Sequence, residues 1–161
     1  MLINYFLASV ISYLGLLLGI ILIKLAPEEQ KPGKKYFILL KKILFFLIIA
    51  FLLFFYKINM IFLLLLLLFM LVLMLTNKLE LEKSPLVYFI LGIIFFLSSK
   101  IINLFVIESI LIFLYGVLTA SLILNLKKKN YREVFVNNLL FFLPVIVLYF
   151  IFQLPLLISN F

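Results

Sequence analysis

Two charged residues, Lys100 and Glu108, fall inside a long apolar stretch of the chain. A charge within an apolar segment is costly in a membrane, so such a residue is by default a functional candidate with a nearby partner. The two residues flank a predicted turn, where their side chains could meet as an ion pair. We expect a polar vestibule on the outer side for an ion, a small solute or a lipid head group, formed by Lys100, Asn103, Glu108, Ser109 and Gln153.

Other polar residues are expected near this vestibule: Ser98, Ser99, Lys57 and Asn59. The interpretation favoured by the closeness of Lys100 and Glu108 to the predicted turn is, however, that the vestibule has no function. Lys100 and Glu108 would then lie at the membrane interface and extend their charged ends into water.

The inventory of residue types argues against catalysis. The chain has no His, no Cys and no Asp, so it lacks a His-based triad, a thiol centre and an aspartate dyad. The pair Gly33-Lys34 lacks the rest of a phosphate-binding loop. A Ser–Lys dyad from Ser98, Ser99 and Lys100 is formally possible, but neighbours in sequence point in different directions on a helix. We expect no catalytic residue, no metal and no cofactor.

Basic residues form two clusters beside apolar segments: Lys34, Lys35, Lys41 and Lys42, and Lys127, Lys128, Lys129 and Arg132. Basic residues next to a membrane attract anionic lipid by about 1 kcal/mol each. We expect a basic cytoplasmic rim that contacts anionic head groups. Membrane topology alone also explains such a rim, and an acidic cytoplasmic partner is a further alternative.

The overall composition indicates that the solvent of this protein is lipid. Of the 161 residues, 68% are hydrophobic, whereas soluble domains are about half apolar. The mean hydropathy of +1.42 agrees with this. The net charge of +8 would suggest nucleic acid in a soluble protein, but basic residues also orient membrane proteins. We expect one membrane domain, residues 1–161, with no nucleic-acid partner.

The lengths of the apolar segments predict the number of spans, because a transmembrane helix needs about 20 residues. The apolar blocks 37–75 and 86–126 exceed one span, so each must fold back at its polar interruption. A polar loop containing Pro32-Gly33 separates the first two helices. The sequence therefore predicts an all-α bundle of six transmembrane helices, at about 2–25, 37–56, 58–75, 86–102, 105–124 and 139–159.

The distribution of basic residues predicts the orientation of this bundle. With six spans, only Lys57 and Lys100 of the 14 basic residues fall on one side, which leaves twelve on the other. By the positive-inside rule, the basic loops are cytoplasmic and both termini lie outside the cell membrane. Similar segments at 13–19 and 114–120, and at 41–47 and 137–143, suggest three out-in-out helical hairpins.

Small residues indicate which helix faces pack together, because lipid provides no hydrophobic drive for helices to associate. They recur on one face of the first, fourth and fifth predicted helices: Ala8, Ser12, Gly15, Gly19, Gly92, Gly116 and Ala120. We expect these three helices to pack closely at the centre. Binding of another protein by one of these faces is the alternative.

Two functions are compatible with the sequence. A non-catalytic subunit or scaffold of a larger membrane complex is favoured by the scarcity of polar residues in the middle of the helices. A small transporter, permease or channel-like protein for an ion, a solute or a lipid is the alternative, with the polar vestibule as its site. The expected partners are anionic membrane lipids and other membrane subunits.

Overall fold

The computed structural model describes residues 2–58, 61, 64, 65, 68, 72, 85–123, 135, 136 and 138–158. Every regular element in these residues is helical, so the predicted all-α class is confirmed. The elements are α1 (Leu2–Leu25), η1 (Pro27–Glu29), α2 (Gln30–Phe55), α4 (Pro85–Ser98), α5 (Ile102–Ile123), η2 (Leu139–Phe141) and α7 (Phe142–Ile158), where η denotes a 3₁₀ helix.

Within the residues that the structure describes, three helices are long and apolar enough to cross a membrane: Ile3–Leu25, Pro32–Phe55 and Ile102–Leu122. Two shorter apolar segments accompany them, Leu86–Ser98 and Leu139–Phe152. The predicted third helix, 58–75, falls mostly outside the described residues.

The start of α2 corrects the sequence-based prediction. Residues 28–36 were expected to form a polar loop, but a short 3₁₀ helix leads directly into α2 at Gln30. Pro32 lies in the first turn of α2, where the backbone N–H groups have no partner within the helix. Proline is therefore tolerated there, and the pair Pro32-Gly33 does not form a turn.

The helix ends near Lys57 and Ser98 have local causes. Lys57 adopts a left-handed φ of 50°, and the N–H groups of Lys57 and Ile58 donate to the carbonyls of Phe54 and Leu53 at 3.1 and 3.4 Å. This hydrogen-bond pattern closes the last turn of a helix. In α4, the Ser98 hydroxyl donates to the Phe95 carbonyl at 2.8 Å, a local bond that competes with helical continuation.

The second hairpin turns earlier in the sequence than predicted. Helix α4 ends at Ser98 rather than at 102, and α5 begins at Ile102 rather than at 105. The Ser99 hydroxyl also bonds to the backbone, donating to the Phe96 carbonyl at 2.6 Å. The carbonyls of Phe95 and Phe96 also accept from the backbone N–H of Ser99, each at 3.2 Å, so the serine hydroxyls add to backbone bonds at this helix end.

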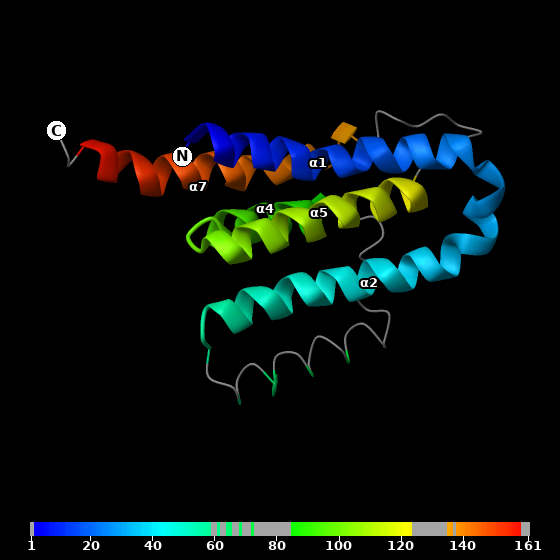
Figure 1. The fold of residues 1–161 in the computed structure, drawn as a ribbon, viewed down its shortest axis with the longest axis horizontal. Coiled ribbons are helices and arrows are strands. Elements are labelled where there is room, and N and C mark those ends of the chain that lie inside the picture. Colours follow the sequence, from blue (N-terminus) through cyan, green and yellow to red (C-terminus); the bar gives the residue numbers. More distant parts are fainter. Residues whose placement is uncertain are drawn as a thin grey trace.

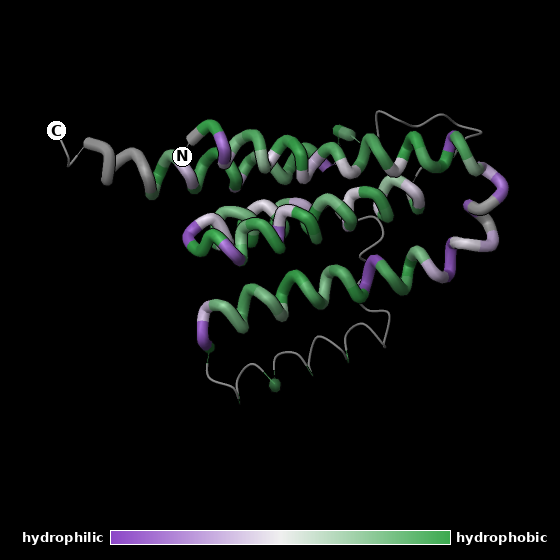
Figure 2. Tube along the Cα trace, in the orientation of Figure 1, coloured by the Kyte–Doolittle hydropathy of each residue, from purple (hydrophilic) through white to green (hydrophobic). Residues whose placement is uncertain are grey.

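Helix α5 lies between the other helices and contacts α1, α2 and α4 (Figure 1). It runs in the same direction as α1, whereas α2, α4 and α7 run in the opposite direction. The α4–α5 turn and the end of α2 lie at the end of the bundle where α1 begins, and the α1–α2 connection lies at the other end. Figure 2 shows hydrophilic residues mainly at the helix ends, with one hydrophilic break inside α2.

The closest helix contact is between α1 and α5. A Cβ atom at Gly15 would overlap the carbonyl of Phe113, and one at Gly19 would lie 2.8 Å from the Cβ of Ala120. On the other side of the contact, a Cβ at Gly116 would lie 3.0 Å from the Leu16 nitrogen. The absence of side chains at these glycines lets the two backbones approach this closely.

A hydrogen bond and a small residue extend these helix contacts. The Ser12 hydroxyl donates to the Ser109 carbonyl at 3.1 Å, which joins α1 to α5. Gly92, in contrast, faces Phe141 at the end of η2 and Pro144 in the first turn of α7. The expected close packing of α4 therefore involves α7 at this glycine, because α4 lies against η2 and α7 as well as α5.

Candidate functional site

One face of α5 is buried along the bundle interior and carries polar side chains. The buried residues on this face recur every three or four positions: Leu104, Glu108, Ile112, Tyr115 and Thr119. This spacing follows the helical repeat, so all five lie on one side of α5. Three of them are polar, which brings a carboxyl group, a phenol and a hydroxyl into the interior.

Lys41 of α2 faces this interior and is only 2% exposed. Its Nζ atom lies 5.0 Å from the centre of the Tyr115 ring, a distance typical of a cation–π contact. Lys41 therefore does not belong to the exposed basic rim. The reason is that α2 begins at Gln30, which places Lys41 about three turns into the helix and about 4 Å from the midpoint of its apolar span.

Tyr88 of α4 completes this group. Its ring lies 6.0 Å from the Tyr115 ring at an interplanar angle of 60°, and both side chains are buried. The Tyr115 hydroxyl makes no hydrogen bond within the described residues. Thr119 lies close to Tyr88, and its own hydroxyl donates to the Tyr115 carbonyl at 2.8 Å. We call Lys41, Tyr88, Tyr115 and Thr119 the inner cluster.

Tyr13 of α1 borders the inner cluster. Its hydroxyl donates to the Phe135 carbonyl at 2.6 Å and lies within electrostatic range of Tyr88. Tyr5, two turns earlier on α1, donates to the Val145 carbonyl of α7 at 3.0 Å. Both bonds join segments that are distant in sequence, so they fix α1 against the C-terminal part of the bundle.

Glu108 is fully buried, and its two carboxylate oxygens have no hydrogen-bond partner among the described residues. It lies about 6 Å from the midpoint of the apolar span of α5. The expected ion pair with Lys100 is absent. Lys100 is exposed, and its Nζ atom lies 5.8 Å from the centres of the Phe96 and Phe152 rings.

The predicted outer vestibule does not assemble from the residues that the structure describes. Asn103 is exposed, and the half-buried Ser109 donates a hydrogen bond to the Phe105 carbonyl at 2.7 Å. The Gln153 side chain and Asn59 lie outside the described residues. The interfacial alternative fits the exposed Lys100 but not Glu108, because α5 turns the carboxyl group into the bundle.

The hydroxyls of Ser98 and Ser99 both donate to backbone carbonyls, so neither is positioned as the nucleophile of a dyad with Lys100. Among the described residues, no group of three or more acidic, His or Cys side chains could hold a metal ion.

The remaining residues of the predicted basic rim have different environments. Lys34 and Lys35 are exposed near the start of α2, and Lys42 is half-buried. Lys127, Lys128, Lys129 and Arg132 lie outside the described residues. The described part of the rim therefore consists of the first turns of α2.

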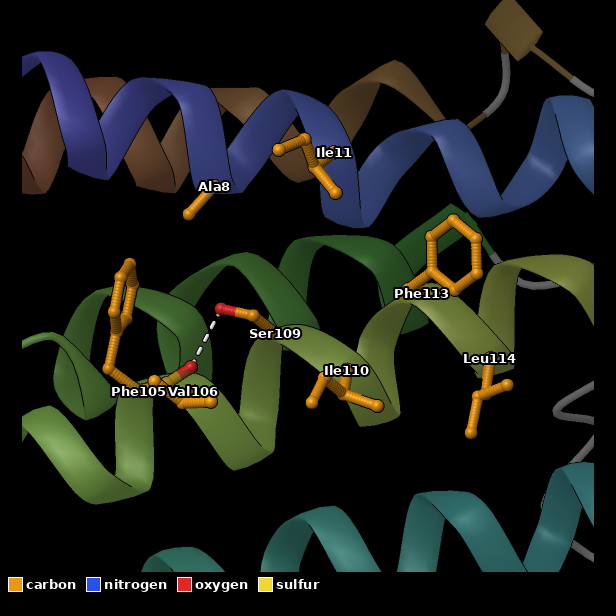
Figure 3. A pocket seen from close by; sticks show the side chains of 8 residues that line it. All are labelled: Ala8, Ile11, Phe105, Val106, Ser109, Ile110, Phe113 and Leu114. Carbon is orange, nitrogen blue, oxygen red and sulfur yellow. Dashed lines mark hydrogen bonds between the residues drawn. The ribbon is translucent and has the colours of Figure 1, made fainter.

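A second feature is an apolar groove of about 540 Å³ between α1 and α5 (Figure 3). Its lining is Ala8, Ile11, Phe105, Val106, Ser109, Ile110, Phe113 and Leu114. The Ser109 hydroxyl already donates to the backbone of its own helix, so this donor is not available to a ligand in the groove. The groove therefore suits an apolar chain better than a polar ligand.

Sequence reasoning missed Lys41 and Tyr88 as members of one site. The available signal was the pair Lys41-Lys42, which interrupts an apolar run with at least four apolar residues on either side. A charge in such a run marks an intramembrane position in the same way as Lys100 and Glu108 do. The incorrect helix start at 37 placed this pair near the interface instead.

The chain matches no family model, no curated protein and no solved structure. The features of the described residues that bear on function are the inner cluster, Glu108 and the α1–α5 groove.

Proposed function

We propose that this protein is a six-span integral membrane protein of the cell membrane, with both termini outside and its basic loops in the cytoplasm. Three helices of sufficient length and hydropathy support the membrane location. The charge distribution supports the orientation, because Lys57 and Lys100 belong to one end of the bundle and Lys34 and Lys35 to the other.

Its function is transport of a small ion or solute through the bundle interior. The observation that carries this proposal is the burial of Lys41 and Glu108 near the midpoints of two apolar spans. Charged residues at this depth characteristically mark substrate pathways or proton relays. They also weaken the main sequence-based argument for a scaffold, which was the scarcity of polar groups in the middle of the helices.

The cost of these side chains supports a functional role. An ionisable group buried without hydrogen bonds destabilises a protein, and Glu108 has two such oxygens among the described residues. An apolar residue of similar size would fill the same place on α5 at lower cost. Residues that break a local rule of stability are concentrated at functional sites.

A non-catalytic subunit of a larger membrane complex is the second candidate. The apolar groove between α1 and α5 favours it, because an apolar helix from another subunit could lie there. In either case the protein uses no cofactor and contacts anionic lipid through Lys34 and Lys35 at its basic end.

Reconstitution of the purified protein separates the two candidates. Liposomes containing the protein alone are loaded with salt, and the release of individual ions and small solutes is followed with time. Transport predicts selective flux from the protein alone, reduced in Lys41→Met and Glu108→Gln but retained in Lys100→Met. Absence of flux, together with a stoichiometric partner after purification from native membranes in mild detergent, would instead identify a subunit.

A further inference from the structure

We infer that Glu108 is a proton-binding site inside the bundle and that its proton exchanges with water during transport. This inference rests on the proposed transport function, for which it names the proton as the coupling ion. Its physical basis is a carboxyl group that is 0% exposed and has no hydrogen-bond partner in the part of the chain that the structure describes. A proton needs no cavity, because it is held by a bond to one carboxyl oxygen.

The environment of Glu108 favours the neutral form of its carboxyl group. An ionised carboxylate that is buried among apolar side chains without hydrogen bonds is so costly that the group takes up a proton instead. Neither Oε atom of Glu108 accepts a hydrogen bond within the described residues. Protonation removes the charge and converts one of these oxygens into a hydroxyl. The neutral acid is therefore the form that fits the closed bundle.

The charged and titratable groups around α5 do not replace this proton. Helices α1, α2 and α4 pack against α5. The buried titratable side chains that they and α5 contribute, besides Glu108, are Tyr5, Tyr13, Lys41, Tyr88 and Tyr115. None of them donates a hydrogen bond to Glu108. The Lys41 ammonium contacts the Tyr115 ring, about 10 Å along α5 from Glu108, and Lys57 and Lys100 are exposed at the outer end.

Apolar side chains border Glu108 toward each end of α5. Leu104 and Ile112 lie one turn before and one turn after it on the same face of the helix, and they are 0% and 1% exposed. Glu108 itself lies about 6 Å from the midpoint of its span, a depth at which ionisable residues form proton relays. Exchange of its proton with water therefore requires the helices to move, as alternating access does in a transporter.

The transport cycle then includes two proton transfers at the same oxygen. On one side of the membrane, hydronium gives a proton to the Glu108 carboxylate and becomes water. On the other side, the neutral acid gives this proton to water and becomes a carboxylate again. Because the carboxylate is the costly form in the closed bundle, the bundle returns more readily once a proton has bound.

The proton is detected on the full chain in mild detergent by infrared spectroscopy, without reference to transport. The six acidic residues of the chain are all glutamates, and exposed glutamates are ionised at pH 7, so they give no carboxylic-acid C=O band. The inference predicts such a band at pH 7 in the wild type and its loss in Glu108→Gln. In deuterated water the band should shift to lower frequency, because deuterium replaces an exchangeable proton.

Two control variants accompany Glu108→Gln. Glu28→Gln removes an exposed glutamate, and Ser109→Ala removes a hydroxyl that is bonded within α5, so both should keep the band. Glutamine has nearly the shape of the neutral acid, and a circular dichroism spectrum verifies that the helices of Glu108→Gln are retained. The inference is overturned if the wild type has no carboxylic-acid band at pH 7, if the band persists in Glu108→Gln, or if it never shifts in deuterated water.

Flux through liposomes distinguishes this inference from the proposed function. Flux is compared with and without a pH difference across the membrane, which should accelerate it in the wild type but not in Glu108→Gln. An exchangeable band without flux of any ion or solute, protons included, would contradict transport and leave the proton site in place. Flux that does not respond to the pH difference would contradict the proton as coupling ion and leave transport in place.

Discussion

The ammonium group of Lys41 lies 5.0 Å from the centre of the Tyr115 ring, with both side chains buried in the bundle interior. The negative face of an aromatic ring stabilises a cation, and this effect is larger where water is excluded. Helix α2 therefore contributes the cation of this contact, and α5 contributes the aromatic ring. It gives a charge in the middle of an apolar helix a favourable neighbour.

Charge reversal should test the contact between Lys41 and Tyr115. In Lys41→Glu, a carboxylate replaces the ammonium beside the negative face of the ring, so we expect the free energy of unfolding to fall by at least about 2 kcal/mol. Lys42→Glu is the matched control, because Lys42 is only half-buried, and its effect should be less than half as large. Unfolding midpoints in mild detergent measure both variants, and equal effects would contradict the burial of Lys41.

Replacement of Glu108 should increase stability. Glu108→Leu removes two buried oxygens that lack hydrogen bonds among the described residues, and we expect a gain of about 1–3 kcal/mol in the free energy of unfolding. Ser109→Ala serves as the control, because its hydroxyl is already bonded within α5. Denaturant titration in detergent measures both, and a clear loss of stability in Glu108→Leu would indicate that the carboxyl group has a structural partner.

The contact between α1 and α5 should not tolerate an added methyl group. Gly15→Ala would place a Cβ atom against the backbone carbonyl of Phe113, which cannot move without shifting α5. We expect a loss of about 1–3 kcal/mol in the free energy of unfolding.

Gly33→Ala provides the comparison for Gly15→Ala, because a Cβ at Gly33 meets only the ring end of Phe37, 2.9 Å away. The Phe37 side chain can rotate aside, so this variant should be close to the wild type. Thermal unfolding of the two variants under the same conditions measures the difference, and equal stabilities would disprove the close approach at Gly15.

The proposed orientation can be mapped with single cysteines, since the natural chain has none. Lys57→Cys and Lys100→Cys should react with a membrane-impermeant maleimide added to intact cells. Lys34→Cys and Lys35→Cys should react only after the membrane is permeabilised. All four native side chains are exposed, so the reactivity of each cysteine in cells depends on the side of the membrane on which it lies. The opposite labelling pattern would reverse the topology.

The sequence was sufficient to predict the helical class and the bounds of α1, because the apolar segment 2–25 has one helical length and ends before Pro27. It was insufficient for the start of α2. Pro32-Gly33 has the composition of a turn, yet proline is equally acceptable in the first turn of a helix. Local preference alone does not choose between these two outcomes.

The inner cluster could not be predicted from sequence because it depends on how helices pair. Lys41, Tyr88 and Tyr115 come from three helices, and apolar residues are spread so evenly around α5 that helical periodicity gives little indication of its inward face. Glu108 was recognised as an exceptional charge, but its depth in the bundle was not. Its burial follows from its position two turns into α5, beyond the α4–α5 turn.

The most direct test of the transport proposal is flux through liposomes that contain only this protein, compared between wild type, Glu108→Gln and Ser109→Ala. The two substituted positions are adjacent in α5, but only Glu108 is fully buried. The proposal predicts wild-type flux in Ser109→Ala and at least about a tenfold reduction in Glu108→Gln, which corresponds to about 1.4 kcal/mol in the barrier. Equal flux in all three proteins, or none in the wild type, would contradict it.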